Sequence, residues 1–119
     1  MIFNRPRAKT KPAKLTIELG GSFDNSYGYV TIDGTKYTSA QTVEVESGAS
    51  VFVRCGTATA FFQTSCKITL NGAEVAAGTW DTVGAAKYTF AATDNCKIVM
   101  TKNTNMGNPY YTAAITMPA

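Results

Sequence analysis

The chain has 119 residues, of which 45% are hydrophobic and 16% charged, and a formal net charge of +3. This is the length of one domain, long enough to bury a hydrophobic core without metal or disulfide staples. No stretch approaches the run of about 18 apolar residues that a membrane-spanning helix needs, and the first residues lack the apolar segment of a secretory signal, so we expect folding in a cytosol and no membrane partner.

The first 13 residues are predicted to form an extended basic arm, and residues 14–119 a folded domain. Pro6 and Pro12 cannot donate backbone hydrogen bonds, which disfavours a regular strand or helix in the arm. The first 14 residues contain five cations and no acid, whereas the remainder has six basic and eight acidic residues. The arm is either a solubilising tail or a strap that orders on a partner, and we expect the strap. Its contact residues would be Met1, Ile2, Phe3, Arg5, Arg7, Lys9 and Lys11.

From residue 14 onward, apolar residues recur at every second position, which is the pattern of half-buried strands. At the start of the domain, for example, Leu15, Ile17 and Leu19 share one face before two glycines interrupt the pattern. Strands are expected over residues 14–19, 27–32, 35–38, 42–46, 50–55, 66–70, 73–76, 87–90, 96–101 and 110–116.

Two of the connections carry a strong hairpin signal. Asp33-Gly34 and Asn71-Gly72 each join two alternating segments, and such pairs tolerate the positive φ angles of a two-residue turn. No window shows a helical period. Three longer connections are expected to be loops: residues 56–65 (or a ragged edge strand), 77–86 and 102–109.

Short strands spaced about 8–12 residues apart are typical of a β-sandwich or a small barrel. The fold class expected from the residues is therefore all-β. The same hairpin occurs in each half of the chain, which is compatible with two related sheet layers or with an ancient duplication, and both readings stay open.

The three cysteines, Cys55, Cys66 and Cys96, fall in phase with apolar neighbours, so we expect buried thiols that act as small hydrophobic side chains. An odd count argues against a complete disulfide framework, although a Cys66–Cys96 bridge is conceivable if their strands adjoin. The chain has no histidine and no C-x-x-C motif, so no metal site is expected.

The residue pattern also predicts no enzyme. Histidine, the usual acid–base catalyst near neutral pH, is absent. Glu44 and Glu46 lie on the solvent face of an alternating strand, and Asp24 and Asp33 are expected to bond their own turn backbone. Asp81 and Asp94 fall in loops, and no phosphate-binding or dinucleotide-binding motif occurs, so we expect no catalytic residue and no cofactor.

Aromatic residues are frequent, and Trp80 and Tyr110 are candidates for contacts with a neighbouring protein or a host surface. Strands ordinarily favour aromatic side chains, so sheet packing plus a protein interface is the first interpretation. A stacking platform for glycans or single-stranded nucleic acid is the second. Because basic residues do not interleave with the aromatics along the chain, nucleic acid is not expected as a partner. The aromatics concerned are Tyr27, Tyr29, Tyr37, Phe61, Phe62, Trp80, Tyr88, Tyr110 and Tyr111.

Three further motifs are the hairpin "YVTIDGTKYT", the strand turn "VEVESG" and the second hairpin "ITLNG". Together they resemble the small immunoglobulin-like β-sandwich modules of tailed-phage and prophage virion proteins. The basic start "MIFNR" is similar to small proteins of phage structural regions. The resemblance covers roughly residues 15–101 and the arm. It implies an immunoglobulin-like β-sandwich with an extended N-terminal arm and an assembly role, and it carries over no catalytic residue.

The resulting hypothesis is a non-enzymatic virion structural protein, assembled in the bacterial cytoplasm, that decorates or reinforces the capsid or tail surface. Its partners would be major capsid or tail proteins, bound by many copies through the basic arm. The alternative is a carbohydrate-binding module that holds a host-surface glycan on exposed aromatics. A third possibility, an arm that contacts packaged nucleic acid, predicts binding that weakens steeply with salt.

Overall fold

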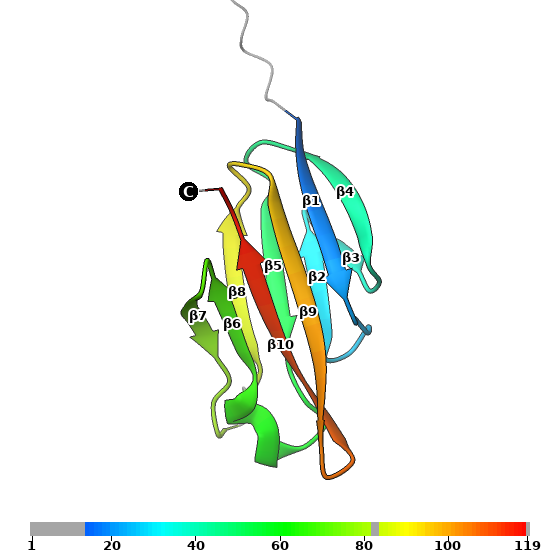
Figure 1. Ribbon diagram of the computed structural model, residues 1–119, viewed down its shortest axis with the longest axis vertical. Coiled ribbons are helices and arrows are strands. Elements are labelled where there is room, and N and C mark those ends of the chain that lie inside the picture. The colour runs from blue at the N-terminus through cyan, green and yellow to red at the C-terminus, as the bar shows by residue number, and fades with distance from the viewer. Residues whose placement is uncertain (1–13, 82–83, 119) are drawn as a thin grey trace, which may run out of the picture.

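The computed structural model describes residues 14–81 and 84–118, and the predicted arm lies outside the described residues. Ten strands and one 3-10 helix make up this part of the chain (Figure 1). Their bounds are β1 Lys14–Gly21, β2 Gly28–Ile32, β3 Thr35–Tyr37, β4 Gln41–Glu46, β5 Ser50–Cys55, η2 Ala60–Ser65, β6 Lys67–Leu70, β7 Ala73–Ala77, β8 Ala86–Ala91, β9 Cys96–Asn105 and β10 Asn108–Thr116.

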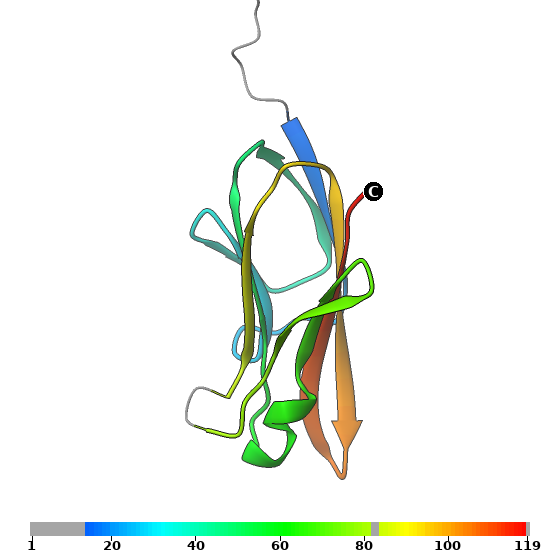
Figure 2. The same cartoon turned by 90° about the vertical axis from the view of Figure 1, so that its left-hand side faces the viewer.

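The strands form two sheets that pack face to face, as the edge-on view in Figure 2 shows. The six-stranded sheet has the order β4-β1-β9-β10-β6-β7, and the four-stranded sheet the order β3-β2-β5-β8. Most neighbours are antiparallel, but β1 pairs with β9, and β10 with β6, in parallel. The all-β prediction is confirmed.

The core lies between the sheets and consists of the inward residues of the alternating strands. Strand β1 shows the clearest case, because Leu15, Ile17 and Leu19 are buried while the residues between them are exposed. No polar or charged residue is buried within the described ranges. The largest fully buried side chains are Ile17, Ile68, Ile98, Met100, Ile115, Val30, Val51 and Val53. Burial of this apolar surface is the main stabilising contribution to the fold.

The cysteines are buried as predicted, and all three are free thiols. Cys55 packs against the Met100 sulfur at 3.5 Å, and the Cys66 thiol lies 3.5 Å from the Phe62 carbonyl oxygen. The conceivable Cys66–Cys96 bridge is therefore not formed.

Both predicted Asx-Gly hairpins are present, one in each sheet. Asp33 and Asn71 have φ angles of 47° and 49°, and each is followed by a glycine with positive φ. In each hairpin the second strand, β3 or β7, is the edge of its sheet. The hairpins differ in their next neighbour, because β2 pairs with β5 antiparallel whereas β6 pairs with β10 in parallel.

Three sequence-based boundaries were wrong. Strand β1 continues through the two glycines, because Gly20 and Gly21 pair with β9. Residues 60–65 form the 3-10 helix η2, which is too short to show a helical period in the sequence. Residues 102–109 are a continuation of β9 and β10 around a two-residue turn at Met106-Gly107, since the pairing extends to Asn105 and Asn108.

Within the described ranges, no helix has the length and apolar character needed to cross a bilayer.

Candidate interaction surface

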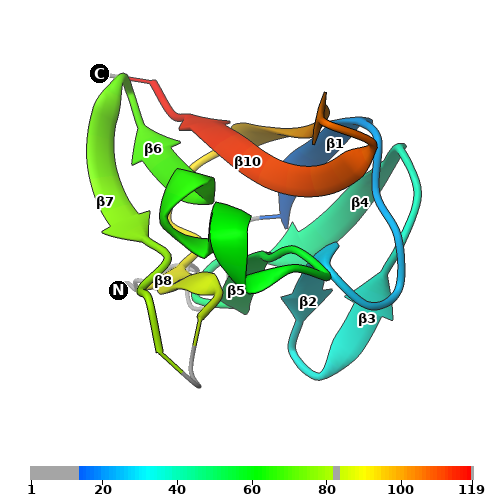
Figure 3. The same cartoon turned by 90° about the horizontal axis from the view of Figure 1, so that it is seen from below.

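Five apolar side chains gather at one end of the two-sheet domain, around η2 and the turn between β9 and β10. Lys14, where the described chain begins, lies at the other end of the domain (Figure 1). Figure 3 shows the domain from the η2 end, with the helix lying in front of the strands. We call this set the apolar end surface; its members are Phe61, Phe62, Trp80, Met106 and Tyr110.

Exposure distinguishes this end from the rest of the domain. Among the described residues, the large hydrophobic side chains that are exposed are Phe61 at 76%, Trp80 at 62% and Met106 at 89%, and all three belong to the apolar end surface. Single exposed hydrophobic residues are ordinary, but a gathered set is typical of a contact site for another molecule.

The aromatic rings of this surface are arranged in two pairs. Phe61 and Trp80 have ring centroids 6.0 Å apart with an interplanar angle of 56°, and Phe62 and Tyr110 stack at 5.7 Å with an angle of 27°. A cavity of about 490 Å³ lies beside Phe61, Phe62, Met106 and Asn108. Paired rings present a large and rigid apolar area, as protein interfaces commonly do.

The backbone around η2 fixes these rings in place. Thr57 donates its hydroxyl to the Pro109 carbonyl oxygen at 2.8 Å, and the Tyr111 amide donates to the Gly56 oxygen at 3.1 Å. These bonds tie the start of the η2 segment to β10. Helix η2 therefore sits where Phe62 can stack on Tyr110.

Gln63 ties η2 to the connection that carries Trp80. With its amide nitrogen turned toward that connection, Gln63 donates to the backbone oxygens of Thr79 at 3.1 Å and Asp81 at 3.3 Å. The backbones of the two segments also approach closely here. A side chain on Gly78 would collide with the backbone carbonyl group of Gln63, so only glycine fits at this position. A second cavity, of about 270 Å³, is lined by Ala60, Gln63, Trp80 and Asp81.

Met106 is the residue of this surface whose conformation is strained. Its φ angle is 53°, in the left-handed region that long side chains avoid at a cost of about 1 kcal/mol. The two other hairpin turns place an aspartate and an asparagine at this position, which tolerate it better. A strained and exposed apolar residue at a turn is an outlier that suggests a role in binding.

The described residues include two of the predicted contact residues, Trp80 and Tyr110. The structure places Trp80 and Tyr110 on one surface, as neighbours of Phe61 and Phe62. The arm residues Met1 to Lys11 lie outside the described residues. Met106 was missed, and the available signal was its position before a glycine in a turn-rich segment.

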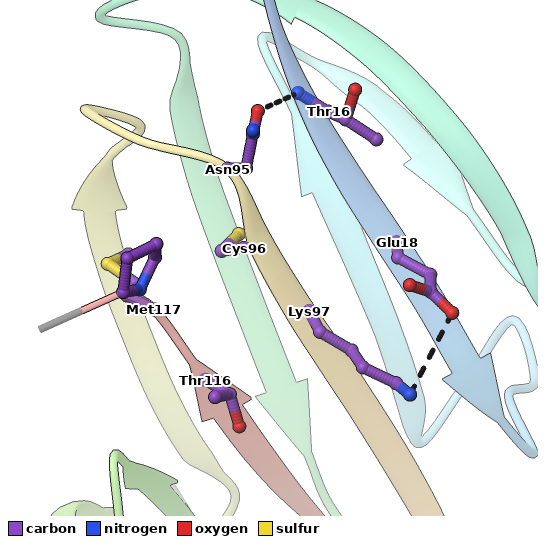
Figure 4. Close-up of a pocket in the computed structure, with 8 residues that line it drawn as sticks. Thr16, Glu18, Asn95, Cys96, Lys97, Thr116 and Met117 are labelled. Carbon is purple, nitrogen blue, oxygen red and sulfur yellow. Dashed lines mark hydrogen bonds and ion pairs between the residues drawn. The ribbon is translucent and has the colours of Figure 1, made fainter.

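A polar groove of about 400 Å³ lies near the opposite end, over β1, β9 and the end of β10 (Figure 4). The Asn95 side-chain oxygen accepts the Thr16 amide at 2.8 Å, and Lys97 lies 3.8 Å from Glu18 (Figure 4). Burial raises the pKa of the Cys96 thiol to about 11, so this thiol is protonated at neutral pH and is a poor nucleophile. The groove therefore has little nucleophilic character.

The other two cysteines and the paired glutamates of β4 lie outside this groove. Burial raises the pKa of the Cys55 and Cys66 thiols as well. Glu44 and Glu46 are exposed on the outer face of β4, as predicted. No group of three or more cysteine and carboxylate side chains in the described ranges is close enough to hold a metal ion.

Asp24 organises the loop between β1 and β2. Its Oδ1 atom accepts the amides of Ser26, Tyr27 and Gly28 at 2.7–3.1 Å, and the Tyr111 side chain is a further hydrogen-bond partner. Burial alone would raise the pKa of Asp24, but these donors hold it below its ordinary value of 3.8. The prediction that Asp24 bonds its own turn is confirmed.

Asp33 departs from the corresponding prediction. Its Oδ1 atom accepts the amide of Ser50 in the neighbouring strand at 2.8 Å, and its own amide donates to the Ser50 carbonyl oxygen at 2.9 Å. The physical reason is the position of the turn, because it lies beside the start of β5 and the side chain can complete the pairing there. Asp33 therefore ties its hairpin to the next strand.

No family model, no curated protein and no solved structure is significantly similar to this chain.

Proposed function

We propose that this chain is a non-enzymatic structural component of a bacteriophage virion, present in many copies on the capsid or tail surface. The observation that carries the proposal is the apolar end surface, where exposed rings and Met106 face solvent together. Such a surface is suited to contact with another protein. The sequence motifs that resemble phage virion modules supply the biological context.

The immunoglobulin-like class is part of the same proposal. Two sheets packed face to face around an apolar core support it. The parallel pairs β1–β9 and β10–β6 are a departure from the purely antiparallel sheets of that class. An experimental structure compared with immunoglobulin domains, strand by strand, would test this assignment.

The proposed mechanism uses two attachment regions. The arm, residues 1–13, would supply electrostatic attraction through Arg5, Arg7, Lys9 and Lys11, and the apolar end surface would supply buried area. Each contact alone is weak, but two linked contacts raise the effective concentration of the second and so strengthen attachment. Many copies on a repeating surface would then reinforce it.

A glycan-binding module is the second candidate, and one observation favours it. Trp80 lines the 270 Å³ cavity together with Gln63 and Asp81, so an exposed ring lies beside polar groups. Sugar rings stack on aromatic faces while their hydroxyls bond polar neighbours. This reading predicts glycan binding that survives loss of the arm.

The test is incorporation into particles. Cells producing the phage would express the wild-type chain, a variant lacking residues 2–12, and the double variant Phe61→Ser/Trp80→Ser, and purified particles would be analysed by quantitative mass spectrometry. We expect both variants to fold, as judged by circular dichroism, and to be depleted from particles at least tenfold. Thr42→Ser, on an exposed position of β4 and away from the apolar end surface, is the control and should be incorporated normally.

Normal incorporation of both variants would contradict the proposed attachment, and absence of the wild-type chain from particles would contradict the virion role. Binding of the purified chain to a glycan array distinguishes the glycan-binding module from the structural virion role. Binding lost in Trp80→Ser and kept without residues 2–12 would favour the glycan module.

A further inference from the structure

Charged side chains are distributed unequally between the two sheets. All four glutamates of the chain, Glu18, Glu44, Glu46 and Glu74, lie on strands of the six-stranded sheet. Three lysines of the same sheet are their partners, with Lys14–Glu46, Lys67–Glu74 and Lys97–Glu18 at 3.8–3.9 Å. This sheet therefore neutralises most of its own charge.

The four-stranded sheet has cations and no acid on its strands. Lys36, Arg54 and Lys87 lie on β3, β5 and β8, and none of them forms an ion pair with a described residue. Asp24 and Asp33 lie in the neighbouring turns, where their Oδ1 atoms accept backbone amides. The strands of this sheet thus carry three cations and no carboxylate, and the two carboxylates in the turns beside them accept backbone amides.

Strand register brings these cations together with two aromatic rings on one face. Tyr29 lies directly opposite Arg54, which lies opposite Lys87, and Thr31 lies opposite both Lys36 and Phe52. Opposed residues point to the same side of a sheet, and Val30 and Val53 point into the core on the other side. Basic and aromatic residues, which do not interleave along the chain, therefore lie side by side on this face of the sheet.

Two of the three cations on this face, Lys36 and Arg54, are held in place. Lys36 Nζ lies 4.2 Å from the centre of the Tyr29 ring and donates to the Asn25 carbonyl oxygen at 2.9 Å. Arg54 lies 5.9 Å from the same ring, and its Nη1 atom donates to the oxygens of Ser26 at 2.7 Å and Tyr27 at 3.3 Å. Side chains fixed before binding lose less conformational entropy when a partner arrives.

We propose that the outer face of the four-stranded sheet is a docking surface for a protein surface rich in aspartate and glutamate. Its centre is Tyr29, Phe52 and Arg54, and its flanks are Lys36 and Lys87. Tyrosine and arginine commonly contribute most of the binding energy at protein interfaces. The Arg54 Nε and Nη2 atoms make no hydrogen bond to a described residue, so they can bind a carboxylate in the bidentate manner.

A protein partner fits this face better than a single strand of nucleic acid. Single strands bind by stacking bases on open ring faces, and Lys36 occupies one face of Tyr29. Tyr29 and Phe52 are half-buried, with centroids 6.5 Å apart at an angle of 56°, so they do not form a parallel platform. This inference concerns a surface distinct from the apolar end surface and does not depend on the proposed function.

The experiment measures binding of a fluorescein-labelled polyglutamate peptide to the full chain by fluorescence anisotropy at low ionic strength. Lys87→Glu is the main variant, because Lys87 makes no hydrogen bond or ion pair with a described residue and its replacement should leave folding intact. Lys102→Glu, on β9 of the other sheet, is the matched control with the same change in net charge. Both variants retain the arm and have the same net charge, so a difference between them reports the position of the changed lysine.

We expect Lys87→Glu to weaken peptide binding about tenfold and Lys102→Glu to weaken it about twofold at most. Arg54→Gln should also weaken binding, and circular dichroism would check its fold. Equal effects of Lys87→Glu and Lys102→Glu would overturn the proposal. So would tighter binding of oligothymidine, which would assign the face to nucleic acid, or self-association of the unbound chain that only Lys87→Glu abolishes, which would assign it to a second copy.

Discussion

The part of the chain that the structure describes has three hairpin turns, and the side chains of two of them bond to neighbouring segments there, whereas that of the third does not. Asp33 accepts the Ser50 amide and Asn71 accepts the Met117 amide, both at 2.8 Å. Their own amides donate to carbonyl oxygens of the same neighbouring segments, Ser50 and Ile115. Met106 occupies the equivalent turn position with a similar φ angle, but its side chain is 89% exposed.

This difference separates a structural turn from a candidate contact. An acceptor side chain at positive φ gains a hydrogen bond in exchange for little strain. Methionine at the same position has strain without an acceptor, so the folded domain by itself gains nothing from it. The repeated Asx-Gly hairpin is therefore a device that ties an edge hairpin to the next strand, and Met106 is suited to a partner outside the chain.

Removing the most heavily bonded turn acceptor gives the largest expected effect. Asp24→Ala takes away a carboxylate that accepts three backbone amides, and we expect it to lower the free energy of unfolding by about 3 kcal/mol in urea denaturation. Asp94→Ala is the control, because among the described residues Asp94 accepts only the adjacent Asn95 amide, and its loss should cost less than about 1 kcal/mol. Equal losses would show that loop aspartates here are interchangeable.

Ionisation of Asp24 should also make the free energy of unfolding depend on pH. The lowered pKa of Asp24 means that its ionised form is favoured by folding, so its contribution is complete above its ordinary pKa of 3.8. As the pH falls below that value and through the lowered folded pKa, the contribution disappears. Urea midpoints measured at pH 7 and pH 3 should therefore fall further for wild type than for Asp24→Asn, and parallel falls would contradict this assignment.

The two Asx turns allow a matched pair of smaller changes. Asp33→Ala and Asn71→Ala each remove one side-chain acceptor and place alanine at positive φ, and we expect each to cost about 1–2 kcal/mol in unfolding free energy. Asp33→Asn keeps an acceptor oxygen and should cost less than about 0.5 kcal/mol. If Asp33→Asn is as damaging as Asp33→Ala, the charge and not the hydrogen bond is what the turn requires.

Changing the third turn should have the smallest effect and the opposite sign. Met106→Asn gives the turn a residue that tolerates positive φ, so we expect stability to rise by about 0.5–1 kcal/mol. Met106→Ala removes the same apolar side chain without that tolerance and should leave stability unchanged. In the particle assay both variants should be depleted, whereas a destabilised Met106→Asn would mean that the methionine has a structural role.

Local pattern determined a large part of this fold. The alternation of apolar residues located the strands and their inward faces, because period-two burial is a property of each strand alone. The Asp33-Gly34 and Asn71-Gly72 turns were located for a similar reason, since few residues accept their backbone angles. The burial of the three cysteines followed from their phase with apolar neighbours.

Pairing between distant segments was decided only by the tertiary structure. Strand β1 extends through its two glycines because they pair with β9 in parallel. The segment between β9 and β10 is rich in turn residues, but most of it is paired as strand. The apolar end surface joins Phe61, Trp80 and Met106 from three connections, and the register of β2 on β5 sets Tyr29 beside Arg54. Such proximities depend on which strands adjoin and in what register. Strand pairing and register are set by the whole chain, because the fold must minimise exposed apolar area and unpaired backbone groups. No single segment therefore encodes them.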